Sequence, residues 1–313
     1  MQLKDFIQET NGDLRDLILA IAKASAELSK TVRNAPITNL TGALENTNVQ
    51  GEIVQKLDDY SNKLLMDFCT KSGSCAGYLS EENEGITTLN KNGSLVVAVD
   101  PLDGSSNIDI AAPIGTIFAI WKRNSTIGEE TVESDYLQNG NACIASGYVL
   151  YGSATMLMFT TKKGVHLFGL NTETNEYELV NEKVELPAKG KIYSLNQGNL
   201  AKFEKAARLF VEDCTSKEKA FSLRYIGSMV GDLYRTFLKG GVFLYPANEG
   251  ETKGKLRLLY ECIPMSLLAE QAGGKSTNGK QRILDIQPTA LHERCAIVIG
   301  SSDLVNQYIQ FSN

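Results

Sequence analysis

Segment 96–107 constrains the fold and the chemistry of this chain more than any other. Residues 96–99 are four apolar residues without alternation, which is typical of a strand covered on both faces of a sheet. The motif Asp100-Pro101-Leu102-Asp103-Gly104 follows directly, and Pro and Asp-Gly favour a turn. Because ligands of α/β sheets bind at the carboxyl ends of strands, this turn is a candidate site.

The residue types in this turn suit both a metal and a phosphate. Asp100 and Asp103 offer the hard oxygen ligands that Mg²⁺ and Mn²⁺ prefer, and the Leu102 carbonyl could join them. Gly104-Ser105-Ser106 supplies backbone amides and hydroxyls that suit a phosphate. Asp-Gly is also a common turn dipeptide, so the segment alone leaves a plain acidic turn open.

Two more apolar runs end in acidic residues. Ser80-Glu81-Glu82 follows the short run Gly77-Tyr78-Leu79, and Glu261 ends an apolar run that starts at Leu256. Three strand-like runs that finish on carboxylates favour a metal site over a plain surface turn.

Together these motifs resemble those of the lithium-sensitive, magnesium-dependent sugar-phosphate phosphatases. The stretch Gly254-Lys255-Leu256-Arg257-Leu258-Leu259-Tyr260-Glu261 resembles the class I fructose-1,6-bisphosphatase branch, whereas inositol monophosphatases carry Trp-Asp there. The other matching stretches, in family order, are Lys56-Leu57-Asp58, Gly115-Thr116-Ile117-Phe118, Tyr151-Gly152-Ser153-Ala154-Thr155-Met156, Arg224-Tyr225-Ile226-Gly227-Ser228-Met229 and Tyr245-Pro246-Ala247-Asn248.

The resemblance implies roles for particular residues. The implied metal ligands are Glu81, Glu82, Asp100, the Leu102 carbonyl, Asp103 and Glu261. Glu82 and Asp58 would orient and deprotonate the attacking water, although helical periodicity alone would explain Asp58 as a charge at a helix start. The implied substrate ligands are Asp103, Gly104, Ser105 and Ser106 at the transferred phosphoryl group, and Asn196, Tyr225, Tyr245, Lys255 and a neighbouring subunit's Arg224 at the distal phosphate.

The implied activity is Mg²⁺-dependent hydrolysis, with Mn²⁺ as another usable ion, of the 1-phosphate of fructose 1,6-bisphosphate in gluconeogenesis. A sedoheptulose-1,7-bisphosphatase, or an enzyme for both sugars, remains an alternative because the same motifs handle either chain. An inactive sugar-phosphate sensor is a further alternative, against which the intact base and metal carboxylates argue.

Periodicity predicts alternating helices and strands, which indicates an α/β protein. Helices are expected over 13–34, 53–69, 196–214 and 262–272, a loop over 35–50, and a hairpin over 156–168. The resemblance implies a layered α-β-α-β-α sandwich. We predict an amino-terminal domain over 1–190, with the metal site and an allosteric segment, and a carboxyl-terminal α/β domain over 191–313, with the sugar 6-phosphate site.

The allosteric segment is Asn11-Gly12-Asp13-Leu14-Arg15, which resembles the family's AMP-binding segment. It differs from the usual Thr-Gly-Glu-Leu-Thr, and Ser94-Leu95 and Lys122 stand where the vertebrate-like pattern has Lys-Tyr and an Arg. Losing a cation and a planar guanidinium removes phosphate contacts, although Arg15 offers a replacement. We therefore expect weak AMP inhibition or none.

Composition limits the partners. A net charge of −6 over 313 residues argues against binding to nucleic acid or to an anionic membrane surface. Six cysteines without Cys-x-x-Cys or zinc spacing are expected to be reduced core thiols. The start of the chain lacks an apolar signal region, and no apolar run reaches the length of a membrane span, so we expect a cytoplasmic protein. The resemblance implies a homotetramer.

Overall fold

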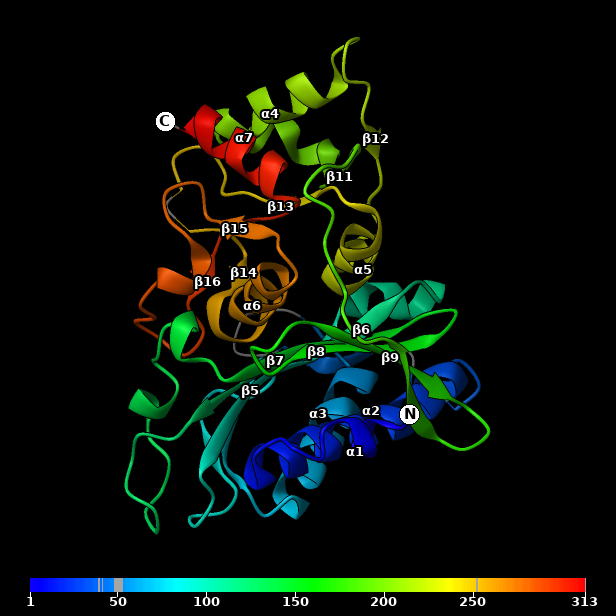
Figure 1. Cartoon of the computed structure of the whole chain (residues 1–313), viewed down its shortest axis with the longest axis vertical. Coiled ribbons are helices and arrows are strands. Elements are labelled where there is room, and N and C mark those ends of the chain that lie inside the picture. Colours follow the sequence, from blue (N-terminus) through cyan, green and yellow to red (C-terminus); the bar gives the residue numbers. More distant parts are fainter. Residues whose placement is uncertain (39, 41, 48–52, 252, 313) are drawn as a thin grey trace.

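The protein is built from two main β-sheets with helices on both sides of each (Figure 1). The structure is a computed structural model that describes residues 1–38, 40, 42–47, 53–251 and 253–312. Helices α2 and α3 lie under the first sheet, α5 and α6 lie between the sheets, and α4 and α7 cover the second sheet. This order of helix, sheet, helix, sheet, helix confirms the predicted α/β layered sandwich.

The first sheet has eight strands in the order β10-β9-β8-β7-β6-β5-β3-β4. Only β3 and β5 are parallel, and the other neighbours are antiparallel. The bounds are β3 Cys75–Ser80, β4 Thr87–Thr88, β5 Leu95–Asp103, β6 Ile114–Lys122, β7 Ala145–Tyr151, β8 Thr155–Thr160, β9 His166–Asn171 and β10 Glu176–Asn181. The β8–β9 pair confirms the predicted hairpin.

Strand β5 is buried along its whole length, as its apolar run predicts. Val97 and Val99 belong to the core shared with α2 (Gly12–Asn34) and α3 (Lys56–Lys71). Val96 and Ala98 belong to the core shared with α5 (Met229–Lys239) and α6 (Ile263–Gln271). Alternate side chains therefore pack against helices on opposite faces of the sheet.

The second sheet has the order β12-β11-β13-β17-β15. The bounds are β11 Ile192–Ser194, β12 Ser222–Leu223, β13 Val242–Tyr245, β15 Lys275–Thr277 and β17 Ile297–Gly300. Helices α4 (Lys205–Thr215) and α7 (Ser302–Ser312) pack on its outer face. The inner face shares one core with the first sheet through α5 and α6. The predicted domain division at residue 190 falls between β10 and β11 and stays a prediction.

The remaining elements are short. They are α1 Leu3–Phe6, the pairs β1 Ala43–Thr47 with β2 Ile53–Gln55 and β14 Leu256–Arg257 with β16 Arg294–Cys295, a π-helical turn Leu258–Cys262, and 3₁₀ turns Ser105–Ile110, Glu133–Asp135, Gly140–Ala142, Gln197–Lys202 and Ile283–Asp285.

Two predicted helices have other bounds. The helix expected over 53–69 begins at Lys56, because the β-branched pair Ile53-Val54 belongs to strand β2. Strand β1 pairs with it, so the predicted loop over 35–50 is wrong for 43–47; residues 39, 41 and 48–50 lie outside the described residues. The helix expected over 196–214 is divided into the 3₁₀ turn Gln197–Lys202 and α4, because the backbone is extended at Phe203 between them.

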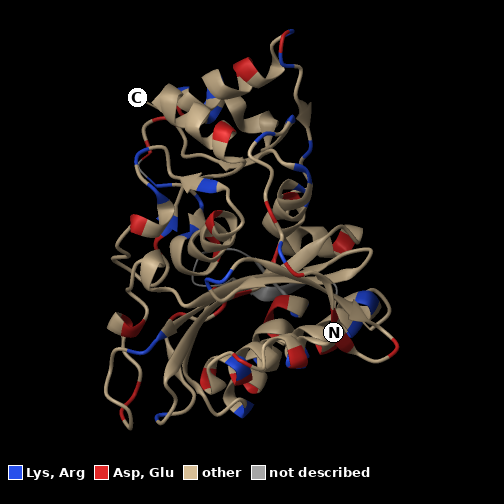
Figure 2. Ribbon diagram, in the orientation of Figure 1, with Lys and Arg blue, Asp and Glu red and all other residues tan. Residues whose placement is uncertain are grey.

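Other predictions for the fold hold. The helix expected over 13–34 is α2, whose first turn is capped by the Asn11 side chain, which accepts a hydrogen bond from the Leu14 amide. All six cysteines are buried and form no disulfide. Among the described residues no helix is long and apolar enough to span a membrane. Figure 2 shows acidic and basic residues interspersed over both halves of the chain.

Candidate active site

Three buried carboxylates converge at the end of strand β5. Asp100, Asp103 and Glu261 each offer an oxygen, and these oxygens lie within 4.8 Å of one another. The pairing of β5 with β6 is irregular between Asp100 and Asp103, at the Pro101-Leu102 step. We call these three residues the acidic centre.

Glu261 reaches the acidic centre by another route than the sequence predicted. Only Leu256–Arg257 is a strand, and the chain then enters the π-helical turn Leu258–Cys262 that carries Glu261. The expectation that Glu261 ends a strand is therefore wrong. An apolar run of this length cannot be told from a buried helical segment by periodicity, and π turns are frequent at functional sites.

The environment of the acidic centre disfavours its negative charge. Burial raises the pKa of Asp100 well above its ordinary value, and the charges of Glu81, Asp103 and Glu261 add to the effect. Burial raises the pKa of Asp103 to about 6 although hydrogen bonds from Val230 and Ser228 oppose the rise. Burial and the charge of Glu81 raise the pKa of Glu261. A divalent cation held by these hard oxygen ligands would relieve this repulsion, so the residues fit a metal.

Asp103 is held by the first turn of helix α5. Its Oδ2 accepts hydrogen bonds from the Ser228 hydroxyl at 2.8 Å and from the Val230 amide at 3.0 Å. Gly104 has φ +80°, and a Cβ there would lie 2.8 Å from the Ser228 Cβ. The turn after β5 can therefore approach α5 this closely only with glycine at this position.

An arginine lies beside the acidic centre. The Arg257 guanidinium is 3.0 Å from the Glu81 carboxylate, with 6% and 12% of their side chains exposed. The Arg257 amide donates to Glu261. Arg257 and Ser228 lie within the motifs that resemble the family, but neither has a role assigned from the sequence. For Arg257 the sequence does carry a signal, because a lone arginine inside an apolar run indicates a buried ion pair. For Ser228 no neighbouring residue gives such a signal.

A cavity of about 420 Å³ joins the acidic centre to most of the other predicted site residues. Those in its lining are Asp58, Glu81, Glu82, Asp100, Leu102, Asp103, Gly104, Ser105, Ser106, Tyr225, Tyr245, Lys255 and Glu261. They come from α3, from the ends of β3, β5 and β13, from the 3₁₀ turn after β5, from the segments that precede α5 and β14, and from the π-helical turn after β14. Residues as far apart in the chain as Asp58 and Glu261 thus share one site.

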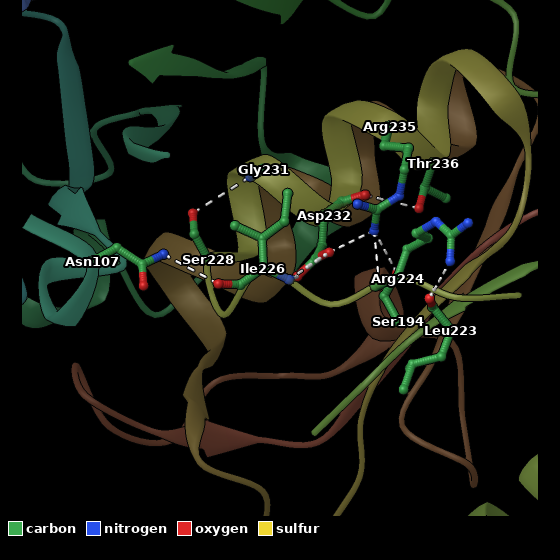
Figure 3. A network of polar contacts seen from close by, with 10 residues as sticks. All are labelled: Asn107, Ser194, Leu223, Arg224, Ile226, Ser228, Gly231, Asp232, Arg235 and Thr236. Carbon is green, nitrogen blue, oxygen red and sulfur yellow. Dashed lines mark hydrogen bonds and ion pairs between the residues drawn. The ribbon is translucent and has the colours of Figure 1, made fainter. Parts of the chain in front are cut away.

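Asn196 and Arg224 lie outside this cavity. Asn196 lines a neighbouring cavity of about 90 Å³ that also contacts Tyr245 and Lys255, and its side chain accepts a hydrogen bond from the Gly198 amide at 3.2 Å. Arg224 is exposed and donates to the Leu223 carbonyl at 2.8 Å. Figure 3 shows its guanidinium pointing away from Ser228.

The predicted allosteric segment lies at the start of α2. Asp13 accepts a hydrogen bond from the Ser94 hydroxyl, which connects this helix to the residue before β5. Arg15 pairs with Asp16 at 3.1 Å. Ser94, which stands where the vertebrate-like pattern has a lysine, and Arg15, the replacement cation, thus both contact carboxylates.

Comparisons with known proteins agree with this geometry. Residues 2–182 match the family model described as the fructose-1-6-bisphosphatase N-terminal domain, and residues 186–313 match that of the C-terminal domain. The chain is similar to the crystal structure of Leishmania major fructose-1,6-bisphosphatase in holo form, with a TM-score of 0.94 and 35% identity over 99% of this chain and 98% of that chain. For the apo form the TM-score is 0.89 and the identity 34%, with the same coverage. The chain therefore belongs to the fructose-1,6-bisphosphatase family.

Proposed function

We propose that this protein hydrolyses the 1-phosphate of fructose 1,6-bisphosphate to give fructose 6-phosphate and inorganic phosphate, a step of gluconeogenesis. The observation that carries the proposal is the acidic centre, which shares one cavity with the turn Gly104-Ser105-Ser106. Phosphate-ester hydrolysis needs mainly positioning and charge neutralisation. The substrate phosphates and the carboxylates that line the cavity are both negatively charged, so the substrate can bind there only together with cations.

The metal ligands we propose are Glu81, Glu82, Asp100, the Leu102 carbonyl, Asp103 and Glu261. When bound, Mg²⁺ or Mn²⁺ neutralises phosphate charge and lowers the pKa of water. The hydrogen bonds to Asp103 and the ion pair of Glu81 orient the carboxylates toward the cavity before any ion binds.

The other lining residues divide between the two phosphates. Glu82 and Asp58 hold the attacking water and accept its proton, and Ser105 and Ser106 donate to the transferred phosphoryl group. Tyr225, Tyr245 and Lys255 bind the distal phosphate, with Asn196 next to them in the adjoining cavity. Burial raises the pKa of Tyr225 to about 12, so its phenol stays protonated and donates.

A phosphate-release screen of sugar bisphosphates tests the proposal. With Mg²⁺ we expect release from fructose 1,6-bisphosphate, and with a chelator none. Sedoheptulose 1,7-bisphosphate belongs in the screen, since a higher kcat/KM for it would replace the fructose assignment. Binding of either sugar bisphosphate without release of phosphate at any Mg²⁺ concentration would contradict the proposal that this protein is an enzyme.

We also propose a homotetramer in which Arg224 binds the distal phosphate of a neighbouring subunit. The Arg224 side chain is exposed and lies outside the cavity of its own subunit, and both observations support this sharing. Arg224→Ala should raise KM and largely keep kcat, because a bidentate guanidinium contributes binding rather than chemistry.

A subunit-mixing experiment tests the sharing. Arg224→Ala subunits are mixed with Asp103→Asn subunits. If Arg224 acts across an interface, some mixed sites combine an intact acidic centre with an intact arginine, and the low KM returns. If Arg224 serves its own subunit, no mixed oligomer recovers it.

A further inference from the structure

The loop formed by residues 224–227, called here the 224–227 loop, is hydrogen-bonded to the rest of the protein through both the amide and the carbonyl of Ile226. The Ile226 amide donates to both oxygens of Asp232, at 3.0 and 3.2 Å. The Ile226 carbonyl accepts a hydrogen bond from the Asn107 side chain at 3.3 Å. The loop thus contacts α5 on one side and the segment after the acidic centre on the other (Figure 3).

Arg235 provides a third attachment. Its Nη2 donates to the Arg224 carbonyl at 2.9 Å, to the Ser194 hydroxyl at 2.9 Å and to Asp232 at 2.5 Å. The Asp232 side chain is fully buried and that of Arg235 is 21% exposed. A buried ion pair that also bonds two backbone groups of one loop holds that loop in one conformation.

The loop bears directly on the site, because Tyr225 and Gly227 line the cavity. Gly227 has φ +83°, which lets the chain turn from the loop into α5. Arg224 and Tyr225, two of the proposed ligands of the distal phosphate, therefore take their positions from the backbone that Asp232 and Arg235 hold.

We infer that Asp232 and Arg235 are positioning residues for the distal phosphate of the substrate, acting through the 224–227 loop. This inference rests on the proposed function. Neither side chain belongs to the cavity lining, so they touch no substrate phosphate directly. Loss of Arg235 should weaken every ligand that carries the distal phosphate and leave the chemistry at the acidic centre unchanged. Asp232 is a less selective position to test, because its charge also raises the pKa of Asp103.

The test is Arg235→Met, which keeps most of the apolar stem and removes every donor. We expect about a tenfold rise in KM for fructose 1,6-bisphosphate and in the inhibition constant of the product fructose 6-phosphate, as for the loss of about 1.4 kcal/mol of binding. The kcat, the half-saturating Mg²⁺ concentration and the inhibition constant of inorganic phosphate should not change. Arg235→Lys, which keeps the cation and a donor, should recover part of the affinity.

The matched control is Lys239→Met, which removes an exposed cation from the end of the same helix. It should leave all these constants at wild-type values. If Arg235→Met lowers kcat or weakens phosphate and Mg²⁺ as much as fructose 6-phosphate, its role is general stability, and the inference is wrong. The inference is also overturned if Arg235→Met changes neither the KM for fructose 1,6-bisphosphate nor the inhibition constant of fructose 6-phosphate. Failure of the wild type to release phosphate would instead contradict the proposed function.

Discussion

Replacing Ser228 with alanine should weaken Mg²⁺ binding at low pH only. The Ser228 hydroxyl donates to Asp103 at 2.8 Å and lowers the pKa of that carboxylate, which is about 6. A hydrogen bond to a charged group contributes about 1.5–3 kcal/mol. In Ser228→Ala the Val230 amide still donates to Asp103, and water can enter the cavity. We therefore take the lower end of this energy range, which corresponds to a rise of about one unit in the pKa of Asp103. The pKa of Asp103 in Ser228→Ala should then be about 7.

A proton on Asp103 competes with the metal, so the half-saturating Mg²⁺ concentration should rise about fivefold at pH 6 and not at all at pH 9. The assay is phosphate release against Mg²⁺ concentration at pH 6, 7.5 and 9, each relative to wild type. Loss of the helix cap costs about 1 kcal/mol of stability at every pH and is followed separately by thermal unfolding. Ser228→Thr, which keeps the hydroxyl, is the control. An equal change at pH 6 and pH 9, or none at pH 6, would refute the reasoning.

Three further outcomes are expected. The Asp103 pKa is about 6 in the fold against an ordinary value of 3.8, so the folded state holds this proton more tightly, and the metal-free protein should lose about 2 kcal/mol of stability between pH 4 and pH 6 from this group. Urea unfolding at each pH, with chelator and with Mg²⁺, measures this loss of stability. If the stabilisation by Mg²⁺ does not increase from pH 4 to pH 6, the prediction is contradicted. Asp103→Asn should fold normally, because the shape is kept, yet nearly abolish turnover, because a charge is lost; wild-type activity at limiting Mg²⁺ would show that Asp103 is no ligand. AMP should inhibit weakly or not at all, and a steep low-micromolar inhibition curve would disprove this.

The sequence predicts local structure well where burial follows a regular period. The apolar run before Asp100 predicts a strand buried on both faces, and β5 is such a strand. Asp100 and Asp103 meet because both lie on one short segment at the end of β5. Helix α2 follows from its apolar period and from Asn11 at its start. In each case the contacts that decide the structure lie within a few residues.

Other features depend on contacts that are distant along the chain. The π-helical turn that carries Glu261 replaces a plausible local alternative, because tertiary packing overrides weak propensities. The hydrogen bond between Ser228 and Asp103 joins residues 125 positions apart. The resemblance could nominate Glu261 as a ligand but could not show how it reaches the site.

The orientation of the acidic centre depends largely on backbone groups. Asp100 accepts from the Leu102 amide, Asp103 from the Val230 amide, and Glu261 from the Arg257 amide. Each buried carboxylate thus has one oxygen held by a main-chain donor, which limits its rotation before any cation binds. The donors to Asp100 and Glu261 are local, two and four residues away in the chain, whereas the donor to Asp103 belongs to the first turn of α5, 127 positions away. A motif search therefore finds the carboxylates, whereas the alignment of Asp103 and the meeting of all three depend on the assembled layers.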